Sequence, residues 1–235
     1  MLISARDLGA ERAIQASALL KLPVSWRKRW ITPKRGRMVI RVPTESIQSF
    51  VSNRSLEYLF EPERVRKPNI PSFFWPGEWD RERRPIEPDY REESVAYRSV
   101  RQIFVEGLDY RESDEYQSKV SELRSGNGSV RGGTVEELNE YFESLLKLAE
   151  TIRADGYKSQ KELGGKLHDE IGIFIGRDGA LIKAEDNFSG THRFAIARIL
   201  NIATVPVTIL AVHDQWADEN PNLLCNPAAL EKGIL

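Results

Sequence analysis

One long helical pattern in the C-terminal half of the chain constrains the fold more than any other feature. Thr134 is suited to cap a helix N-terminus, and the two glutamates that soon follow it favour the helix dipole. Gly156 is well placed to end the same helix, because glycine readily adopts the left-handed backbone found at helix ends. Between them, apolar side chains recur at spacings of three and four, at Leu138, Tyr141, Phe142, Leu145, Leu148 and Ile152. The pattern predicts an amphipathic helix with one face in a core.

After this helix, strand and helix signals alternate. Two β-rich runs, 171–175 and 181–183, flank an Asp-Gly pair that is typical of a hairpin turn. A second helix is predicted over 191–200, and a final buried strand over 205–212. The order helix, hairpin, helix, strand predicts an α/β unit in which helices are layered on a sheet.

The first half of the chain is less regular. Residues 38–43 have the composition of a short strand that a proline stops, and 44–47 that of a short helix or turn. Prolines, aromatic residues and charges then interrupt any long element, although 90–104 keep helical spacing. We therefore divide the chain into five parts. They are an N-terminal helix with a basic arm (1–37), a first core strand (38–50), an insertion (51–133), the α/β core (134–216) and a tail (217–235).

Composition excludes several classes of protein. The 34 basic and 35 acidic residues nearly cancel, whereas a generic nucleic-acid-binding protein usually has a basic excess. Cys225 is the single cysteine, so no disulfide can form within the chain and a zinc site built on thiolates is disfavoured. The start lacks the apolar run of a signal peptide, and no stretch has the length of a membrane span. We expect a cytoplasmic protein.

A candidate binding site lies at the start of the second predicted helix, in the run Ser189-Gly190-Thr191-His192-Arg193. Glycine lets the backbone approach a ligand, and the free N–H groups of a first helical turn favour an anion. Thr191, His192 and Arg193 add hydroxyl, imidazole and guanidinium donors, and arginine is suited to phosphate. The run predicts a phosphate-binding cradle. The alternative is an ordinary helix cap followed by a surface His and Arg.

Four segments, in order, resemble the ParB/sulfiredoxin superfamily. Residues 148–160 are similar to the Leu-Ala-x-Ser-Ile-x-x-x-Gly-x-x-Gln helix of ParB proteins. Residues 190–197 stand where those proteins have their Gly-Glu-Arg-Arg box, 204–209 resemble their closing strand, and 38–47 correspond to their first strand. The resemblance is continuous from Leu145 to Trp216. It implies an α/β (α+β) fold of the ParB/sulfiredoxin type, with a small sheet, flanking helices and a long, mostly helical insertion.

Members of this superfamily bind nucleotides through the box, so the resemblance implies a nucleotide here. Sulfiredoxins need a cysteine and ParB proteins a glutamate at the position of Thr191. The DNA-reading module that follows the ParB box does not fit in the short tail after Val212. The box is most similar to the Asp-Gly-x-His-Arg version of the ParB-like small-molecule kinases. The resemblance therefore implies ATP or another nucleotide with Mg²⁺, and phosphate transfer to a small polar or glycan acceptor.

Within this kinase interpretation, His192 and Arg193 hold phosphates, and His192 is also a candidate catalytic residue. A carboxylate would orient or deprotonate the acceptor hydroxyl. Glu185 and Asp186, just before the box, are the candidates, although each taken alone is better explained as a solvated hairpin residue. The kinase pattern has an acid where this chain has Ser189, so the acid assignment stays open.

The resemblance also implies that Gly156 and Gln160 contact the nucleotide, as in ParB relatives; the alternative for Gln160 is a polar loop residue. The surroundings of His168 have the composition of a surface loop rather than of a metal site, and no cluster of metal ligands is predicted. The run from His213 to Trp216 ends the last strand, and its resemblance to the ending of related-looking proteins implies that it forms part of the pocket.

The insertion mixes charged and aromatic residues, which suits a polar substrate such as a sugar; a structural lid is the alternative. The resemblance suggests relatives encoded near surface-polysaccharide genes, and it therefore implies polysaccharide biosynthesis as the setting. The main alternative to a kinase is a ParB-like module that binds or hydrolyses a nucleotide without phosphotransfer. DNA is a disfavoured partner of that module, and neither interpretation includes a membrane span.

Overall fold

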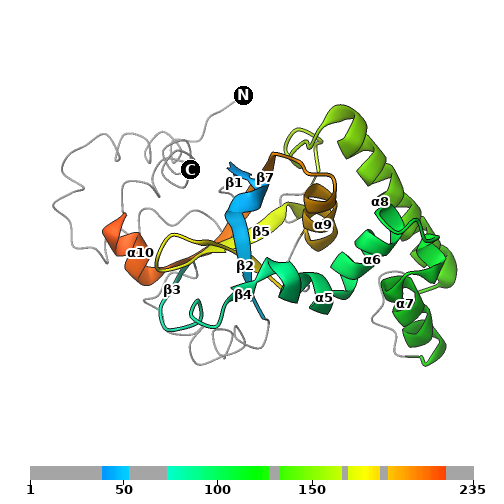
Figure 1. Cartoon of the computed structure of the whole chain (residues 1–235), viewed down its shortest axis with the longest axis horizontal. Coiled ribbons are helices and arrows are strands. Elements are labelled where there is room, and N and C mark those ends of the chain that lie inside the picture. Colours follow the sequence, from blue (N-terminus) through cyan, green and yellow to red (C-terminus); the bar gives the residue numbers. More distant parts are fainter. Residues whose placement is uncertain (1–38, 53–72, 127–132, 166–168, 186–189, 221–235) are drawn as a thin grey trace, which may run out of the picture.

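The computed structural model describes residues 39–52, 73–126, 133–165, 169–185 and 190–220 (Figure 1). Several predicted features lie outside these residues. They are the N-terminal helix and basic arm over 1–37, His168, Asp186, Ser189 and Cys225.

The described residues form a mixed α/β structure around a seven-stranded sheet. Its order is β1-β7-β5-β6-β2-β4, and β3 pairs separately with β7. The strands are β1 (Val39–Pro43), β2 (Ile47–Val51), β3 (Phe74–Trp75), β4 (Arg84–Pro85), β5 (Ile171–Ile175), β6 (Leu181–Ala184) and β7 (Thr204–His213). β5 runs parallel to β7, and β2 runs parallel to β6, while the β5–β6 and β1–β7 pairs are antiparallel.

Six α-helices accompany this sheet in the described part of the chain (Figure 1). They are α5 (Arg91–Glu93), α6 (Val95–Phe104), α7 (Asp114–Arg124), α8 (Val135–Asp155), α9 (Thr191–Ile199) and α10 (Asp214–Glu219). Shorter helical turns cover Thr44–Ser46, Ile86–Tyr90 and Tyr110–Glu112. None of the helices in the described ranges is both long and apolar enough to cross a membrane.

The long C-terminal helix is confirmed, together with both of its ends. Thr134 caps α8 by accepting a hydrogen bond from the backbone N–H of Glu137 at 3.2 Å. Gly156 ends the helix with a φ of 80°. Most of the predicted apolar positions are buried, whereas Tyr141 and Leu148 are only partly so.

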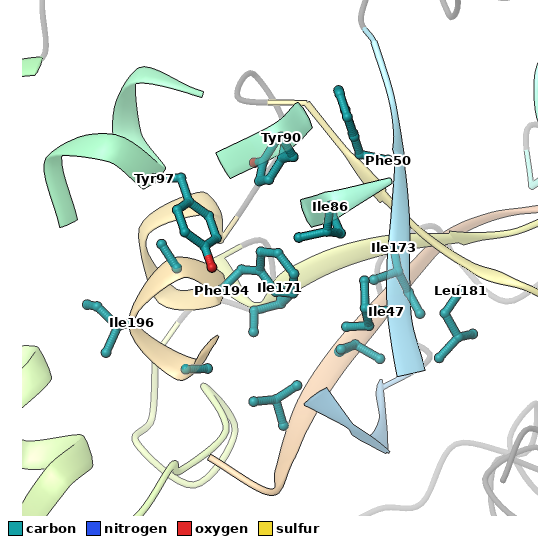
Figure 2. Close-up of a cluster of buried hydrophobic side chains, with 14 of the residues drawn as sticks. Ile47, Phe50, Ile86, Tyr90, Tyr97, Ile171, Ile173, Leu181, Phe194 and Ile196 are labelled. Atoms are coloured by element: carbon teal, nitrogen blue, oxygen red, sulfur yellow. The ribbon is translucent and has the colours of Figure 1, made fainter. Parts of the chain in front are cut away.

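The two faces of the sheet are packed by different parts of the chain. Ile171 and Ile173 point to the face covered by α9, where Phe194 and Tyr97 join them (Figure 2). Ile175 belongs to the same core cluster. The alternate residue Phe174 points to the other face, against Trp75, Trp79 and their apolar neighbours. This alternation is the two-residue period of a β-strand.

An irregularity in β7 changes which residues share a face. Ile173 pairs with Ile209, but Phe174 pairs with Ala211, so Leu210 is an extra residue in β7. Such a bulge shifts the two-residue alternation. Ile209 and Val212, three residues apart, therefore belong to the same core cluster.

The sheet is larger than the small sheet that the sequence predicted. A second strand, β2, follows the Thr44–Ser46 turn, where a single strand was predicted over 38–50. Two further strands, β3 and β4, come from the insertion over 51–133 and pair with β7 and β2. Most of the other described residues of that insertion are helical, as predicted, with turns at 76–83 and 105–109, and its side chains Phe73 and Phe74 belong to the main core.

Candidate functional site

Gly190 stands directly before α9 and has a φ of 80°. A Cβ atom at this position would lie 2.5 Å from the Cα of Ile171 and 2.7 Å from the carbonyl oxygen of Glu170. Both the left-handed backbone and this close approach require glycine. The sequence predicted that the glycine makes room for a ligand, whereas in the structure that space is occupied by the chain's own residues at the start of β5.

Arg193 and Gln160 were both predicted to contact a nucleotide, and the structure brings them together. In the amide orientation that satisfies both side chains, the Gln160 oxygen accepts hydrogen bonds from Nη1 and Nη2 of Arg193 at 2.9 and 2.5 Å. Gln160 is only 4% exposed, so its amide is fixed beside the first turn of α9. Two residues from distant segments thus meet at the predicted box.

Glu170 lies next to this pair and was not predicted. Its side chain is fully buried, and its Oε1 accepts a hydrogen bond from the backbone N–H of Gln160. Its Oε2 has no hydrogen-bond partner in the described part of the chain. Burial raises the pKa of Glu170, and the Gln160 N–H and the Arg193 charge only partly oppose this. A buried carboxyl group that ionises less readily than an exposed glutamate therefore lies near the Arg193 charge.

Gly156 and Tyr157 complete the loop that leads from α8 to Gln160. A Cβ atom at Gly156 would meet nothing within 4 Å, so its φ of 80°, not crowding, calls for glycine. Tyr157 is buried, and burial raises the pKa of its phenol above the usual value. The nearby Arg193 opposes this rise only in part. The predicted Gly156 is therefore a helix end that directs Tyr157 and Gln160 towards Arg193.

The ring of His192 is held on both sides by other helices. Its Nε2 lies 2.6 Å from Oε2 of Glu115 in α7, and its Nδ1 lies 3.0 Å from the hydroxyl of Tyr141 in α8. Neither partner was predicted, because neither is close to His192 in sequence. The two ring nitrogens that were expected to contact phosphate are therefore both engaged within the protein.

Glu185 and Thr191 also lie at this end of the sheet. Thr191 is buried in the first turn of α9. Glu185 follows β6, and its backbone N–H donates to the carbonyl of Val51 at 3.1 Å, where β2 ends. Because β6 runs antiparallel to β5, these strand ends lie beside the start of β5 and hence near Gly190. Lys183, which was not predicted, is fully buried on β6, and its Nζ donates to the carbonyl of Ala184 at 2.7 Å.

The run from His213 to Trp216 is separate from this site. Val212 pairs with Ile175 at one end of β5, whereas Gly190 approaches Ile171 at the other. His213 caps α10 through its Nδ1, and its Nε2–H donates to the carbonyl of Gly77 at 2.9 Å. The expectation that this run belongs to the pocket at the box is wrong, since it lies at the opposite end of the sheet.

A hollow of about 490 Å³ lies at the C-terminal end of α9, away from the box. Its lining includes Arg198, Tyr97 and Glu87, and the Tyr97 hydroxyl donates to Glu87 at 3.4 Å. Burial raises the pKa of Tyr97, and the nearby Glu87 carboxylate raises it further. α9 thus has the predicted box at one end and a polar hollow at the other.

Within the described ranges, no three His, Cys, Asp or Glu side chains are grouped so that they could hold a metal ion. Comparison of the chain with protein-family models, with curated proteins and with solved structures found no match. A function for the chain therefore has to be inferred from the geometry of the site.

Proposed function

We propose that the chain binds a nucleotide by its phosphates at the first turn of α9 and transfers a phosphoryl group to a hydroxyl of a small polar or glycan acceptor. One observation carries this proposal. Arg193 is bonded to the neutral amide of Gln160, and in the described part of the chain no carboxylate lies within ion-pair distance of it. An arginine whose hydrogen-bond partner is neutral keeps its charge for an anion.

The surroundings of Arg193 favour an anion in two further ways. The backbone N–H groups at the start of a helix point outward and carry a partial positive charge, which suits phosphate oxygens. Burial raises the pKa of Glu170, so this carboxyl ionises less readily than an exposed glutamate and opposes a bound anion less. Arginine also matches phosphate with two parallel hydrogen bonds.

Phosphoryl transfer needs chiefly positioning and neutralisation of charge. Arg193, held by Gln160, would orient the phosphates at the start of α9. Magnesium enters such sites on the nucleotide and usually needs only one or two carboxylates from the protein. Glu185, at the same end of the sheet, is the candidate that would orient the acceptor hydroxyl.

The second candidate function is nucleotide binding without transfer, by a ParB-like binding module. The position of His192 favours it, because Glu115 and Tyr141 occupy both ring nitrogens and leave neither for a reacting group. The two functions share the anion site and differ in whether an acceptor hydroxyl is used.

The experiment that tests the proposal measures the melting temperature with ATP, ADP, CTP and GTP, each with and without Mg²⁺. A ligand that binds only the folded protein raises the melting temperature. A rise with one nucleotide supports the site, and acceptor-dependent consumption of that nucleotide then distinguishes transfer from binding alone. The absence of any rise, confirmed by calorimetric titration, would overturn nucleotide binding.

A further inference from the structure

The contact between Glu115 and His192 joins the insertion to the predicted box. Glu115 lies in α7, within the insertion, and His192 lies in the first turn of α9 (Figure 1). The two side chains are 13% and 17% exposed, and Nε2 and Oε2 are 2.6 Å apart. At this distance and burial the contact is a short hydrogen bond largely shielded from water.

The contact with Glu115 assigns a donor role to one ring nitrogen of His192. An ionised carboxylate can only accept, so Nε2 of His192 must donate its hydrogen to Glu115. In the neutral ring Nδ1 is then the acceptor, and it takes the hydrogen of the Tyr141 hydroxyl at 3.0 Å. The ring cannot turn without losing both bonds, so its orientation is set by α7 and α8.

Glu115 is itself on a firmly attached helix. Its backbone N–H donates to Oγ of Ser99 in α6 at 2.7 Å. One residue earlier, Asp114 receives hydrogen bonds from Gln102 and Arg98, both also in α6, each at 3.0 Å. α6 in turn packs directly against α9. The start of α7 is therefore anchored to the same helix that supports α9.

We infer that Glu115 is a positioning residue for the anion site: by fixing His192, it holds the first turn of α9, and with it Arg193, in a preset orientation. This inference rests on the proposed function, because it assigns the insertion a role in the same site. His192 and Arg193 are consecutive, so a shift of one displaces the backbone of the other. Donors that are already in place bind an anion without first losing conformational freedom.

The test compares four proteins by calorimetric titration with Mg·ATP and with the other three nucleotides. Glu115→Ala should weaken binding by about tenfold, the equivalent of one charge-assisted hydrogen bond. Glu115→Gln should restore binding to within about threefold, because its amide oxygen still accepts the Nε2–H of His192. Glu122→Ala is the matched control, since the Glu122 side chain lies on α7 and, among the residues that the structure describes, pairs only with its neighbours Lys119 and Ser118.

A proton spectrum gives a readout that does not depend on any ligand. The imidazole Nε2–H should exchange slowly with water in the wild type and in Glu115→Gln, and should be lost from the spectrum in Glu115→Ala. Tyr141→Phe, which removes the phenol hydroxyl bonded to Nδ1 and keeps the ring, serves if Glu115→Ala does not fold, and it should weaken nucleotide binding in the same direction.

The outcomes separate this inference from the proposed function. If the wild type binds none of the nucleotides, the proposed function fails, and the inference with it. If the wild type binds and neither Glu115→Ala nor Tyr141→Phe weakens binding, only the inference is overturned. A loss in Glu115→Ala that Glu115→Gln does not restore would also overturn it, because the charge of Glu115 rather than its position would then matter.

Discussion

Arg177 donates hydrogen bonds to the Asp80 carboxylate from its backbone N–H, its Nε and its Nη2, at 2.7, 3.0 and 2.7 Å. Asp80 belongs to the aromatic segment of the insertion, and Arg177 to the hairpin turn between β5 and β6. Burial alone raises the pKa of Asp80, but the bonds and charge of Arg177, with His213, outweigh it and hold the pKa below its usual value. This pair fastens the insertion to the hairpin.

Asp80→Ala should therefore lower the free energy of unfolding by about 2 kcal/mol, because the partly buried Arg177 guanidinium loses its buried carboxylate and keeps, in the described part of the chain, only the Gly77 carbonyl and the exposed Glu78. Since the pKa of Asp80 is lowered in the folded protein, its contribution is present above the unfolded value of 3.8 and is lost as the pH falls below it. Urea unfolding at pH 7 and pH 3 measures both effects. Glu93→Ala, which removes the exposed partner of Arg84, should cost at most about 1 kcal/mol. Equal losses in the two variants would contradict the prediction.

Gly190→Ala should destabilise the fold more than an alanine at another left-handed glycine. Gly107 has a similar φ of 76°, but a Cβ there would meet nothing within 4 Å. Gly107→Ala should cost about 1 kcal/mol, from backbone conformation alone. Gly190→Ala adds a clash with the backbone of Ile171 and should cost about 3 kcal/mol or more. Thermal unfolding of both variants checks the order, and a smaller loss at Gly190 would show that the approach to Ile171 is not tight.

Glu170→Gln should change how stability depends on pH. The pKa of Glu170 is raised above 4.5 in the folded protein. Its contribution to the free energy of unfolding is therefore fully present below pH 4.5 and is lost as the pH rises through the folded pKa. The glutamine keeps an acceptor for the Gln160 N–H but has no charge to bury. The variant should match the wild type near pH 4 and exceed it by about 1 kcal/mol near pH 8. A variant that is less stable than the wild type at pH 8 would show that Glu170 is held as a carboxylate.

Arg193→Ala should weaken nucleotide binding by at least about tenfold, because a bidentate phosphate contact is lost. The variant should still melt cooperatively, since the partner that Arg193 leaves behind is a neutral amide. Calorimetric titration and a melting curve measure both properties. Arg153→Ala, at an exposed position in the last turn of α8, is the control that removes the same charge elsewhere. Equal affinities in the two variants would place the nucleotide somewhere other than the start of α9.

The periodicity of apolar residues predicted those helices and strands whose own sequence shows which face is buried. α8, the β5–β6 hairpin, α9 and β7 each carry their own apolar repeat and end signals, so their positions follow from the sequence. β2, β3 and β4 do not. β2 is short and follows a turn, and β3 and β4 have two residues each, so only pairing with distant strands defines them. Such long-range pairing leaves no local period to detect.

The residues of the candidate site also fall into those that the sequence could reveal and those that it could not. Gln160, Gly190 and Arg193 stand at ends of predicted elements and could be recognised there. Glu115 and Tyr141 could not, because each lies within a helix that is distant from His192 in sequence and reaches it by a single side-chain contact. Glu170 had one usable signal, a charged residue directly before the wholly apolar strand β5.

The position of β7 has a consequence for how the protein is made. β7 pairs with β1, β3 and β5, yet it is the last strand that the ribosome synthesises among those described. β1 is therefore synthesised long before β7, and it has no strand to pair with while the intervening chain is translated. Sheets that depend on contacts between residues distant in sequence form late and slowly. In a nascent chain that stops before Thr204, β1 and β3 lack the strand with which they pair among those described. The synthesis of β7 is therefore the step that allows both to join the sheet.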